Sequence, residues 1–259
     1  MDTVISTLVI ALAVSLAINL SMFLVAFRLQ SDKLTDISYA VTFATIAIWA
    51  FSSSDASLYH LLLLAVVILW SLRLGGFLLY RVVRSGKDSR FDDMRNNFLK
   101  FGRFWLAQAV TVWVIMIPSI LAFDTHSSLN LVALIGILLW AIGLACESVA
   151  DLQKLLFSMH PSNKDKWIDT GIWKYSRHPN YFGEILVWAG IYLYAAISLS
   201  LPQAVIALVS PLFIITLLLF VSGIPILEKS ADKRWGKLPE YRQYKKHTSI
   251  LIPLPRKKS

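Results

Sequence analysis

One short stretch holds most of the side chains in this sequence that could do chemistry. Five polar or ionisable residues fall within ten positions there, namely Tyr175, Arg177, His178, Asn180 and Glu184. Pro179 lacks an N–H and suits the first turn of a helix, so we predict that a helix begins at about His178 to Asn180. Asn180 and Glu184 then share one face of this helix. We interpret the group as a ligand site, because ionisable residues inside membrane helices are costly and usually functional. The alternative is that Arg177 only anchors the helix at the membrane surface and that Glu184 is satisfied within the protein.

The elements that must position these residues are membrane helices. The chain has 259 residues, 56% of them hydrophobic, and a mean hydropathy of +0.62. Several apolar runs exceed the roughly 18 residues that span a bilayer. We predict an all-α membrane protein with seven spans, at about 4–27, 35–53, 58–82, 104–123, 129–151, 180–198 and 203–225. No linker or soluble domain is evident, so residues 1–259 are expected to form one domain, with the cofactor half at about 129–259.

The basic residues predict the orientation of the chain. All Lys and Arg residues except Arg73 follow the first, third, fifth or seventh span. By the positive-inside rule the N-terminus then faces out and the C-terminus lies in the cytoplasm, as in a protein of the bacterial inner membrane. The net charge of +9 is explained by this orientation and by anionic lipid, so nucleic acid is not expected as a partner. The single cysteine, Cys146, permits no disulfide within the chain.

Three more groups of polar residues lie at the cytoplasmic ends of spans. Arg73 lies within the third span, where a guanidinium either reaches the membrane surface or pairs with a carboxylate. Glu147 and Asp151 share one face of the fifth span, where two acids are costly without donors. Glu228 follows the seventh span, after the helix breakers Gly223 and Pro225.

These groups together predict a site for an anionic ligand. Arginines, lysines, a histidine and a helix N-terminus attract a phosphate-bearing cofactor, and acids beside them suit ribose hydroxyls or an amide. The spans would present an apolar cleft to a lipid-soluble substrate. No G-x-G-x-x-G or Walker sequence is present, so a nucleotide must be held by other means. No ligand spacing indicates a metal, and a Ser-His-Asp hydrolase has no better support.

The segment KYSRHPNYFGE resembles the signature of the bacterial steroid 5α-reductase-like membrane enzymes (the DUF1295 type), which are related to sterol C14 and C7 reductases. GLACESVADLQK and LEKSADKRWGKLPEYRQYKKHTSILIP resemble two further segments of that family. The resemblance implies a seven-helix fold, NADPH entering from the cytoplasm, and hydride transfer to an activated C=C bond of a lipid. It also implies cofactor contacts at Asp151, Tyr175, Arg177, His178, Asn180, Glu184, Glu228 and Arg234.

The catalytic half of the site departs from that family. Where steroid 5α-reductases have a Tyr three residues before an Arg, this sequence has Trp70 before Arg73, and Trp cannot donate a proton as an acid. We expect Glu147 or Tyr80 to supply the proton, with Arg73 as a third catalytic candidate. Steroid specificity therefore does not follow from the resemblance.

The main rival is a membrane methyltransferase. Isoprenylcysteine carboxyl methyltransferases and phospholipid N-methyltransferases share an RHPxYxG run followed by an acid, and they bind S-adenosylmethionine. Lys154, Lys164 and Lys166 favour the reductase, because they suit a 2′-phosphate better than a cationic sulfonium. A lipid carrier without enzymatic activity would not need so many charges at one set of helix ends. No obligate protein partner is evident, and membrane lipids are the expected surroundings.

Overall fold

The computed structural model describes residues 2–85 and 91–256, with side chains described for residues 4–80 and 91–256. Every regular element in these ranges is helical, and the β-bridge between Ser176 and Ser249 is isolated. The predicted all-α class is therefore confirmed. The longer helices are α1 (Asp2–Arg28), α2 (Lys33–Ser52), α3 (Leu58–Ser85), α4 (Phe98–Phe123), α5 (Leu131–Met159), α6 (Pro179–Ala196), α9 (Ile224–Trp235) and α10 (Pro239–His247).

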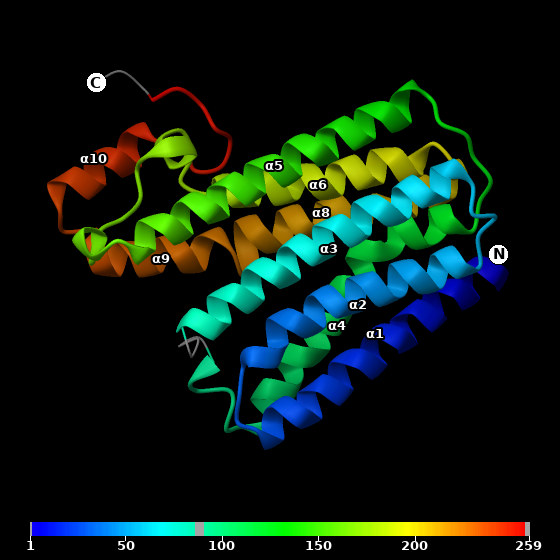
Figure 1. Cartoon of the computed structure of the whole chain (residues 1–259), viewed down its shortest axis with the longest axis horizontal. Coiled ribbons are helices and arrows are strands. Elements are labelled where there is room, and N and C mark those ends of the chain that lie inside the picture. The colour runs from blue at the N-terminus through cyan, green and yellow to red at the C-terminus, as the bar shows by residue number, and fades with distance from the viewer. Residues whose placement is uncertain (1, 86–90, 257–259) are drawn as a thin grey trace. The chain divides into compact units, whose positions relative to one another are not determined.

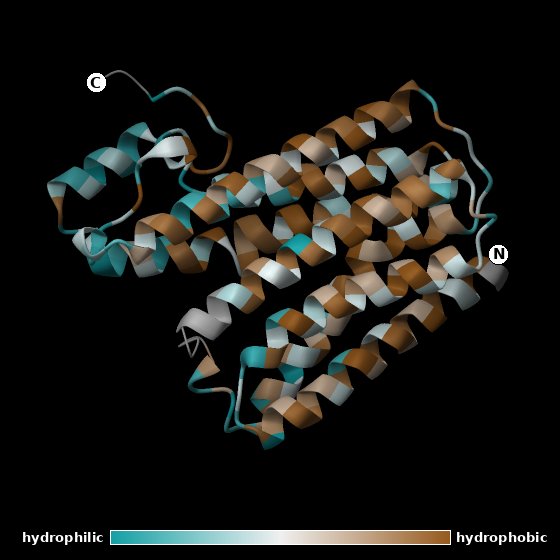
Figure 2. Ribbon diagram, in the orientation of Figure 1, coloured by the Kyte–Doolittle hydropathy of each residue, from teal (hydrophilic) through white to brown (hydrophobic). Residues whose placement is uncertain are grey.

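Six helical segments of the described chain are long and apolar enough to cross a bilayer, which indicates an integral membrane protein. They are Val4–Arg28, Lys33–Ser52, Leu58–Tyr80, Phe98–Phe123, Leu131–Met159 and Leu201–Trp235. The predicted span 180–198 forms α6 but is not among the six, since Pro179, Asn180 and Glu184 make its first two turns polar. Figure 2 shows hydrophobic residues along most of α1 to α5 and hydrophilic residues gathered on α9 and α10.

The predicted orientation is not tested by these helices and stays a prediction. Some of the bases on which it rests lie outside the described residues, namely Lys87, Arg90, Lys257 and Lys258. The side chains of Arg81 and Arg84 are likewise outside the described part of the chain.

Two predicted boundaries were wrong by more than a turn. Helix α4 begins at Phe98 rather than near residue 104, because the Asn97 side chain accepts a hydrogen bond from the backbone N–H of Lys100 (3.0 Å) and caps the helix there. Helix α5 continues to Met159 rather than ending near residue 151. Asp151 and Lys154 therefore project from a continuous helix and not from a loop.

The last predicted span, 203–225, is divided in the structure. It comprises α7 (Leu201–Ala207), α8 (Val209–Thr216) and a π-helical turn, η4 (Leu217–Val221). Gly223 then separates η4 from α9, and a Cβ atom at this position would lie 2.4 Å from the Leu218 carbonyl oxygen. Only glycine fits so close to the backbone of the preceding turn. Glu228 lies inside α9, after the break at Gly223, as the sequence predicted.

The chain forms two compact units, Met1–Leu134 with Ile191–Ser210, and Ile135–Gly190 with Pro211–Ser259. In the first unit α1, α2 and α4 lie side by side (Figure 1). Their interior contains a polar network, in which Gln108 Nε2 donates to Asn19 Oδ1 (2.9 Å) and to Ser38 Oγ (2.8 Å), and Asn19 donates to Thr42 Oγ1 (3.1 Å). Hydrogen bonds of this kind satisfy polar groups where no water is at hand and fix the register of neighbouring helices.

In the second unit α5 and α6 approach to backbone contact along a row of glycines. A Cβ atom on Gly143 would lie 2.6 Å from the Gly183 carbonyl oxygen, and one on Gly183 would lie 2.6 Å from the backbone nitrogen of Glu147. Further along, a Cβ atom on Gly190 would lie 2.6 Å from the Gly136 carbonyl oxygen. Small residues at regular spacing allow such close helix packing in membranes. This seam positions the start of α6 against the second half of α5.

Candidate functional site

The segment that carries Arg177 and His178 is fastened to α5. Trp173 is buried, and its indole Nε1 donates to the Ala150 carbonyl oxygen (3.0 Å). The backbone N–H of Ile172 donates to Gln153 Oε1 (3.0 Å), and Trp173 packs with Ala150 and Ile168 in a small apolar cluster. The short helix Gly171–Lys174 is thereby held at the level of residues 150–153 of α5.

The C-terminal segment folds back over the same residues. Tyr244 Oη donates to the Trp173 carbonyl oxygen (3.0 Å), and the backbone N–H of Arg177 donates to the Ser249 carbonyl oxygen (2.8 Å). Ser176 is fully buried, and its hydroxyl donates to the Leu251 carbonyl oxygen (2.6 Å). Backbone segments far apart in sequence are therefore joined around the start of α6.

Glu228 connects this segment to α9 and α10 through three charged or polar partners. Arg177 forms an ion pair with Glu228 Oε2, His178 Nε2 lies 2.9 Å from Oε1, and Lys245 Nζ lies 3.1 Å from Oε2. Burial lowers the pKa of His178, and the hydrogen bond to Glu228 only partly opposes this effect. Burial alone would lower the pKa of Lys245. The hydrogen bonds of its ammonium group to Asp232 and Glu228 outweigh burial, so the pKa of Lys245 is raised above its ordinary value. His178 is thus a neutral donor and Arg177 and Lys245 are the cations of the network.

A cavity of about 510 Å³ opens beside this network. That size is within the range of pockets that bind small molecules and cofactors. The described lining residues are Lys154, Phe157, Ser158, Asn163, Lys164, Asp165, Lys166, Trp167, Ile168, Trp173, Arg177, His178, Leu227, Glu228, Ser230, Ala231, Arg234, Trp235, Tyr241 and Tyr244.

The lining of this cavity is both basic and aromatic. Its Lys and Arg side chains outnumber its carboxylates by five to two. Trp167, Trp235 and Tyr241 form an aromatic group in which the ring centroids of Trp167 and Tyr241 are 5.1 Å apart and those of Trp235 and Tyr241 are 5.8 Å apart. Lys154 Nζ lies 4.9 Å from the ring centroid of Trp173. A ligand that carries negative charge and a flat ring would match both features.

Two buried donors at the cavity have no hydrogen-bond acceptor among the described residues. They are Nε of Arg177 and the indole Nε1 of Trp167. Buried polar groups are nearly always satisfied in native proteins, so an unsatisfied one needs an explanation. Acceptor oxygens on a bound ligand would supply the missing partners.

The structure brings several of the predicted cofactor residues to this cavity. Those in its lining are Lys154, Arg177, His178, Glu228 and Arg234. Arg234 also pairs with Asp165 through NH2 and Oδ1 (2.5 Å), which fixes α9 against the loop after α5. Their assembly from three segments supports the site prediction without testing their roles.

Other predicted residues lie outside the cavity lining. Asn180 Nδ2 donates to Asp151 Oδ1 (3.3 Å), so these two residues join α6 to α5. Glu184 lies one turn further along α6, and Glu147 on α5 is only 4% exposed. Tyr175 is exposed and stacks its ring under the ammonium group of Lys174 (6.0 Å to the centroid).

The two remaining catalytic candidates belong to the first unit. Arg73 and Tyr80 lie on α3, where the guanidinium of Arg73 is 5.6 Å from the ring centroid of Phe77. Tyr80 is exposed. Their catalytic roles, like that of Glu147, stay predictions.

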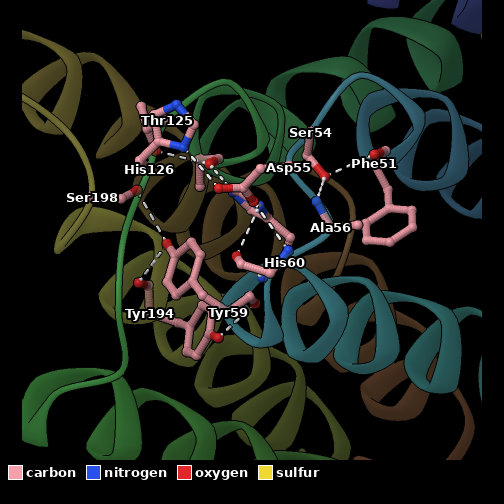
Figure 3. A network of polar contacts seen from close by, with 12 residues as sticks. Phe51, Ser54, Asp55, Ala56, Tyr59, His60, Thr125, His126, Tyr194 and Ser198 are labelled. Carbon is pink, nitrogen blue, oxygen red and sulfur yellow. Dashed lines mark hydrogen bonds and ion pairs between the residues drawn. The ribbon is translucent and has the colours of Figure 1, made fainter.

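A second polar cluster in the first unit surrounds the turn between α2 and α3 (Figure 3). Asp55 Oδ1 lies 2.6 Å from His60 Nδ1, and Asp55 Oδ2 lies 2.7 Å from His126 Nδ1. The hydrogen bond from His126 holds the pKa of Asp55 well below its ordinary value. Buried His60 also directs Nε2 at the Ala122 carbonyl oxygen (3.1 Å), so the cluster ties the α2–α3 turn to the end of α4. This satisfied network is structural.

Sequence reasoning missed the aromatic lining. The predicted site residues included none of the five Trp and Tyr side chains that line the cavity, namely Trp167, Trp173, Trp235, Tyr241 and Tyr244. The clue in the sequence was the high density of Trp and Tyr among charged residues between 167 and 244, which is unusual for solvent-exposed loops.

Comparison with known proteins identifies one related family. A model of the family described as "Protein of unknown function (DUF1295)" matches residues 22–248. No curated protein matches the chain, and no solved structure does. The match confirms the DUF1295 type named in the sequence analysis, whereas the relation to steroid 5α-reductases and their activity stays a prediction.

Proposed function

This chain belongs to the DUF1295 family, whose description assigns no function, and from that premise we propose that it binds NADPH and reduces a polarised C=C bond of a lipid-soluble substrate. The observation that carries the proposal is the basic and aromatic cavity at the start of α6. Its surplus of positive charge favours a ligand with several phosphates, and its aromatic rings favour a nucleobase.

The donors at the cavity fit the chemistry of such a cofactor. The free Nε of Arg177 and the free Nε1 of Trp167 need acceptors, and phosphate and ribose oxygens are acceptors. The N-terminus of α6 adds a partial positive charge beside Arg177. Lys164 and Lys166, both exposed at the cavity, would hold a 2′-phosphate. When bound, NADPH would supply the hydride.

The lipid side of the reaction rests on the membrane helices and on the resemblance. Six apolar segments place the chain in a bilayer, where substrates are lipid-soluble. The RHPNYFGE run resembles that of sterol and steroid reductases, which act on C=C bonds. A proton must accompany the hydride, and Glu147 on α5 is proposed as its donor, while Tyr80 and Arg73 of the first unit stay the other candidates predicted from the sequence.

The rival function, methyl transfer from S-adenosylmethionine, has one feature in its favour. Trp167, Trp235 and Tyr241 could face a sulfonium cation, because aromatic faces attract cations. The five Lys and Arg side chains in the same lining disfavour it, since they would repel that cation. We therefore propose the reductase as the first function to test.

The test is a binding measurement on the purified full chain in lipid nanodiscs. NADPH, NADH and S-adenosylmethionine are titrated separately, and native mass spectrometry of the unsupplemented protein looks for a retained cofactor. The proposal predicts binding of NADPH, weaker binding of NADH and none of S-adenosylmethionine. Binding of S-adenosylmethionine with none of NADPH would overturn the reductase in favour of the methyltransferase.

The proposal also requires the cavity to face the cytoplasm, where NADPH is available. Reporter fusions after Asn163 should then read internal, and fusions after Asp55 and Asp124 should read external. An internal signal at Asp124 would contradict both the orientation and the proposed placement in the bacterial inner membrane.

A further inference from the structure

The end of the described chain is a non-helical segment fastened to the backbone just before α6. Besides the bonds from Ser176 and Arg177, the backbone N–H of Leu254 donates to the Tyr175 carbonyl oxygen (3.2 Å). Arg256 Nε donates to the Lys174 carbonyl oxygen (3.2 Å). Residues 249–256 are therefore held in place by hydrogen bonds along their length and cannot turn freely about their axis.

Three large apolar side chains of this segment are exposed. Ile250, Ile252 and Leu254 are 44%, 53% and 52% exposed, whereas Leu251 and Pro253 between them are half-buried. The three exposed side chains lie within five positions of one another, so they form one exposed apolar group. We call Ile250, Ile252 and Leu254 the tail ridge. Contiguous exposed apolar groups of this kind mark sites that contact a partner or a membrane.

The level of the tail ridge along α5 identifies what it contacts. The segment to which the tail is fastened is itself held beside residues 150–153 of α5. At that level α5 still exposes Leu152 and Leu156, and its exposed apolar row continues to Met159. With 29 residues, α5 is about 43 Å long at 1.5 Å per residue. It is longer than the roughly 30 Å hydrocarbon core, so its last turns and the tail ridge lie in the interfacial layer.

Basic side chains flank the tail ridge. Lys174 is exposed beside the fastening point, and Arg256 follows the ridge directly, near Asp169 (3.8 Å). Basic residues next to interfacial apolar groups are attracted to anionic lipid headgroups. A bilayer of anionic lipid therefore matches both the apolar and the charged parts of this surface.

We propose that the tail ridge inserts into the boundary between headgroups and acyl chains of the membrane and anchors the C-terminal segment there. This inference does not depend on the identity of the cofactor. Insertion of the tail ridge would attach residues 249–256 to lipid, in addition to their hydrogen bonds to the backbone before α6.

The test uses the single cysteine of the chain. Cys146→Ser provides a background without thiols, because serine can replace the thiol as donor to the Pro179 carbonyl oxygen (3.3 Å). Ile252→Cys is then labelled with a polarity-sensitive fluorophore, and Lys237→Cys, in the exposed turn between α9 and α10, is the matched control. Both proteins are reconstituted in vesicles that contain anionic lipid, with some of the acyl chains brominated.

At residue 252 we expect blue-shifted emission and loss of fluorescence when the brominated lipid is present, with neither effect at residue 237. Emission typical of water at residue 252, without quenching, would overturn the proposal. Crosslinking of two chains through residue 252, without quenching by lipid, would overturn it in favour of a contact between copies. Quenching should also be weaker in neutral lipid, and equal quenching in both lipids would remove Lys174 and Arg256 from the proposal.

Discussion

Replacement of Arg177 by lysine isolates what its guanidinium contributes to ligand binding. The side chain of Arg177 is 11% exposed, one of its terminal nitrogens pairs with Glu228, and its Nε has no acceptor among the described residues. Lysine keeps the charge, so the pair with Glu228 can persist, but it loses the second nitrogen that would reach a phosphate. One charge-assisted hydrogen bond contributes about 1.5–3 kcal/mol, and each 1.4 kcal/mol is about tenfold in affinity. Arg177→Lys should therefore weaken NADPH binding about 10-fold to 100-fold.

The assay is an NADPH titration of wild-type and variant proteins in nanodiscs, with thermal unfolding measured on the same samples. Arg242→Lys is the matched control, because Arg242 is exposed on α10 and is not part of the cavity lining. An unchanged dissociation constant for Arg177→Lys, with wild-type thermal stability, would refute the argument that the free Nε awaits a ligand. A loss of affinity equal to that of Arg242→Lys would refute it as well.

Three other predictions test the packing of α5 against α6, the pH dependence of stability due to His178, and the preference for NADPH over NADH. Gly143→Ala places a Cβ atom 2.6 Å from a backbone oxygen of α6 and should lower the free energy of unfolding by about 1–3 kcal/mol. In the control Gly76→Ala the new Cβ atom has no atom within 4 Å, so this variant should keep its stability. Equal thermal stability of the two variants would contradict the close packing of α5 and α6. Because burial lowers the pKa of His178, the unfolded chain takes up a proton near pH 6.5 while the folded protein does not, so stability should fall as the pH drops below about 6.5. His178→Gln should reduce this slope, and an unchanged slope would show that another group is responsible. Neutralising Lys164 and Lys166 together should narrow the difference in affinity between NADPH and NADH, and a constant difference would exclude them from a 2′-phosphate site.

The start of α6 could be predicted from sequence because its signals are local. Proline is favoured in the first turn of a helix, and α6 begins at Pro179. The pairing of Asn180 with Asp151 could also be expected, since two polar groups on apolar helices need partners. In both cases the physical constraint acts on one residue or on one helix face.

The aromatic lining and the length of α5 could not be predicted in the same way. Trp167 meets Tyr241 across more than seventy positions of the chain, and no periodicity links such distant residues. Asp151 and Lys154 looked like the end of a membrane span, but a helix does not stop where its hydropathy falls. It continues while its backbone hydrogen bonds are kept, and here Phe157 of the extra turns packs against the cluster of Ile168 and Trp173.

The glycine seam between α5 and α6 has a consequence for how a lipid could reach the protein. Where Gly143 and Gly183 bring the two backbones together, even a methyl group has no room. An acyl chain is thicker than a methyl group. A lipid therefore cannot pass between α5 and α6 where the two helices are in backbone contact. For the proposed reductase, a lipid-soluble substrate would therefore have to enter elsewhere than between α5 and α6.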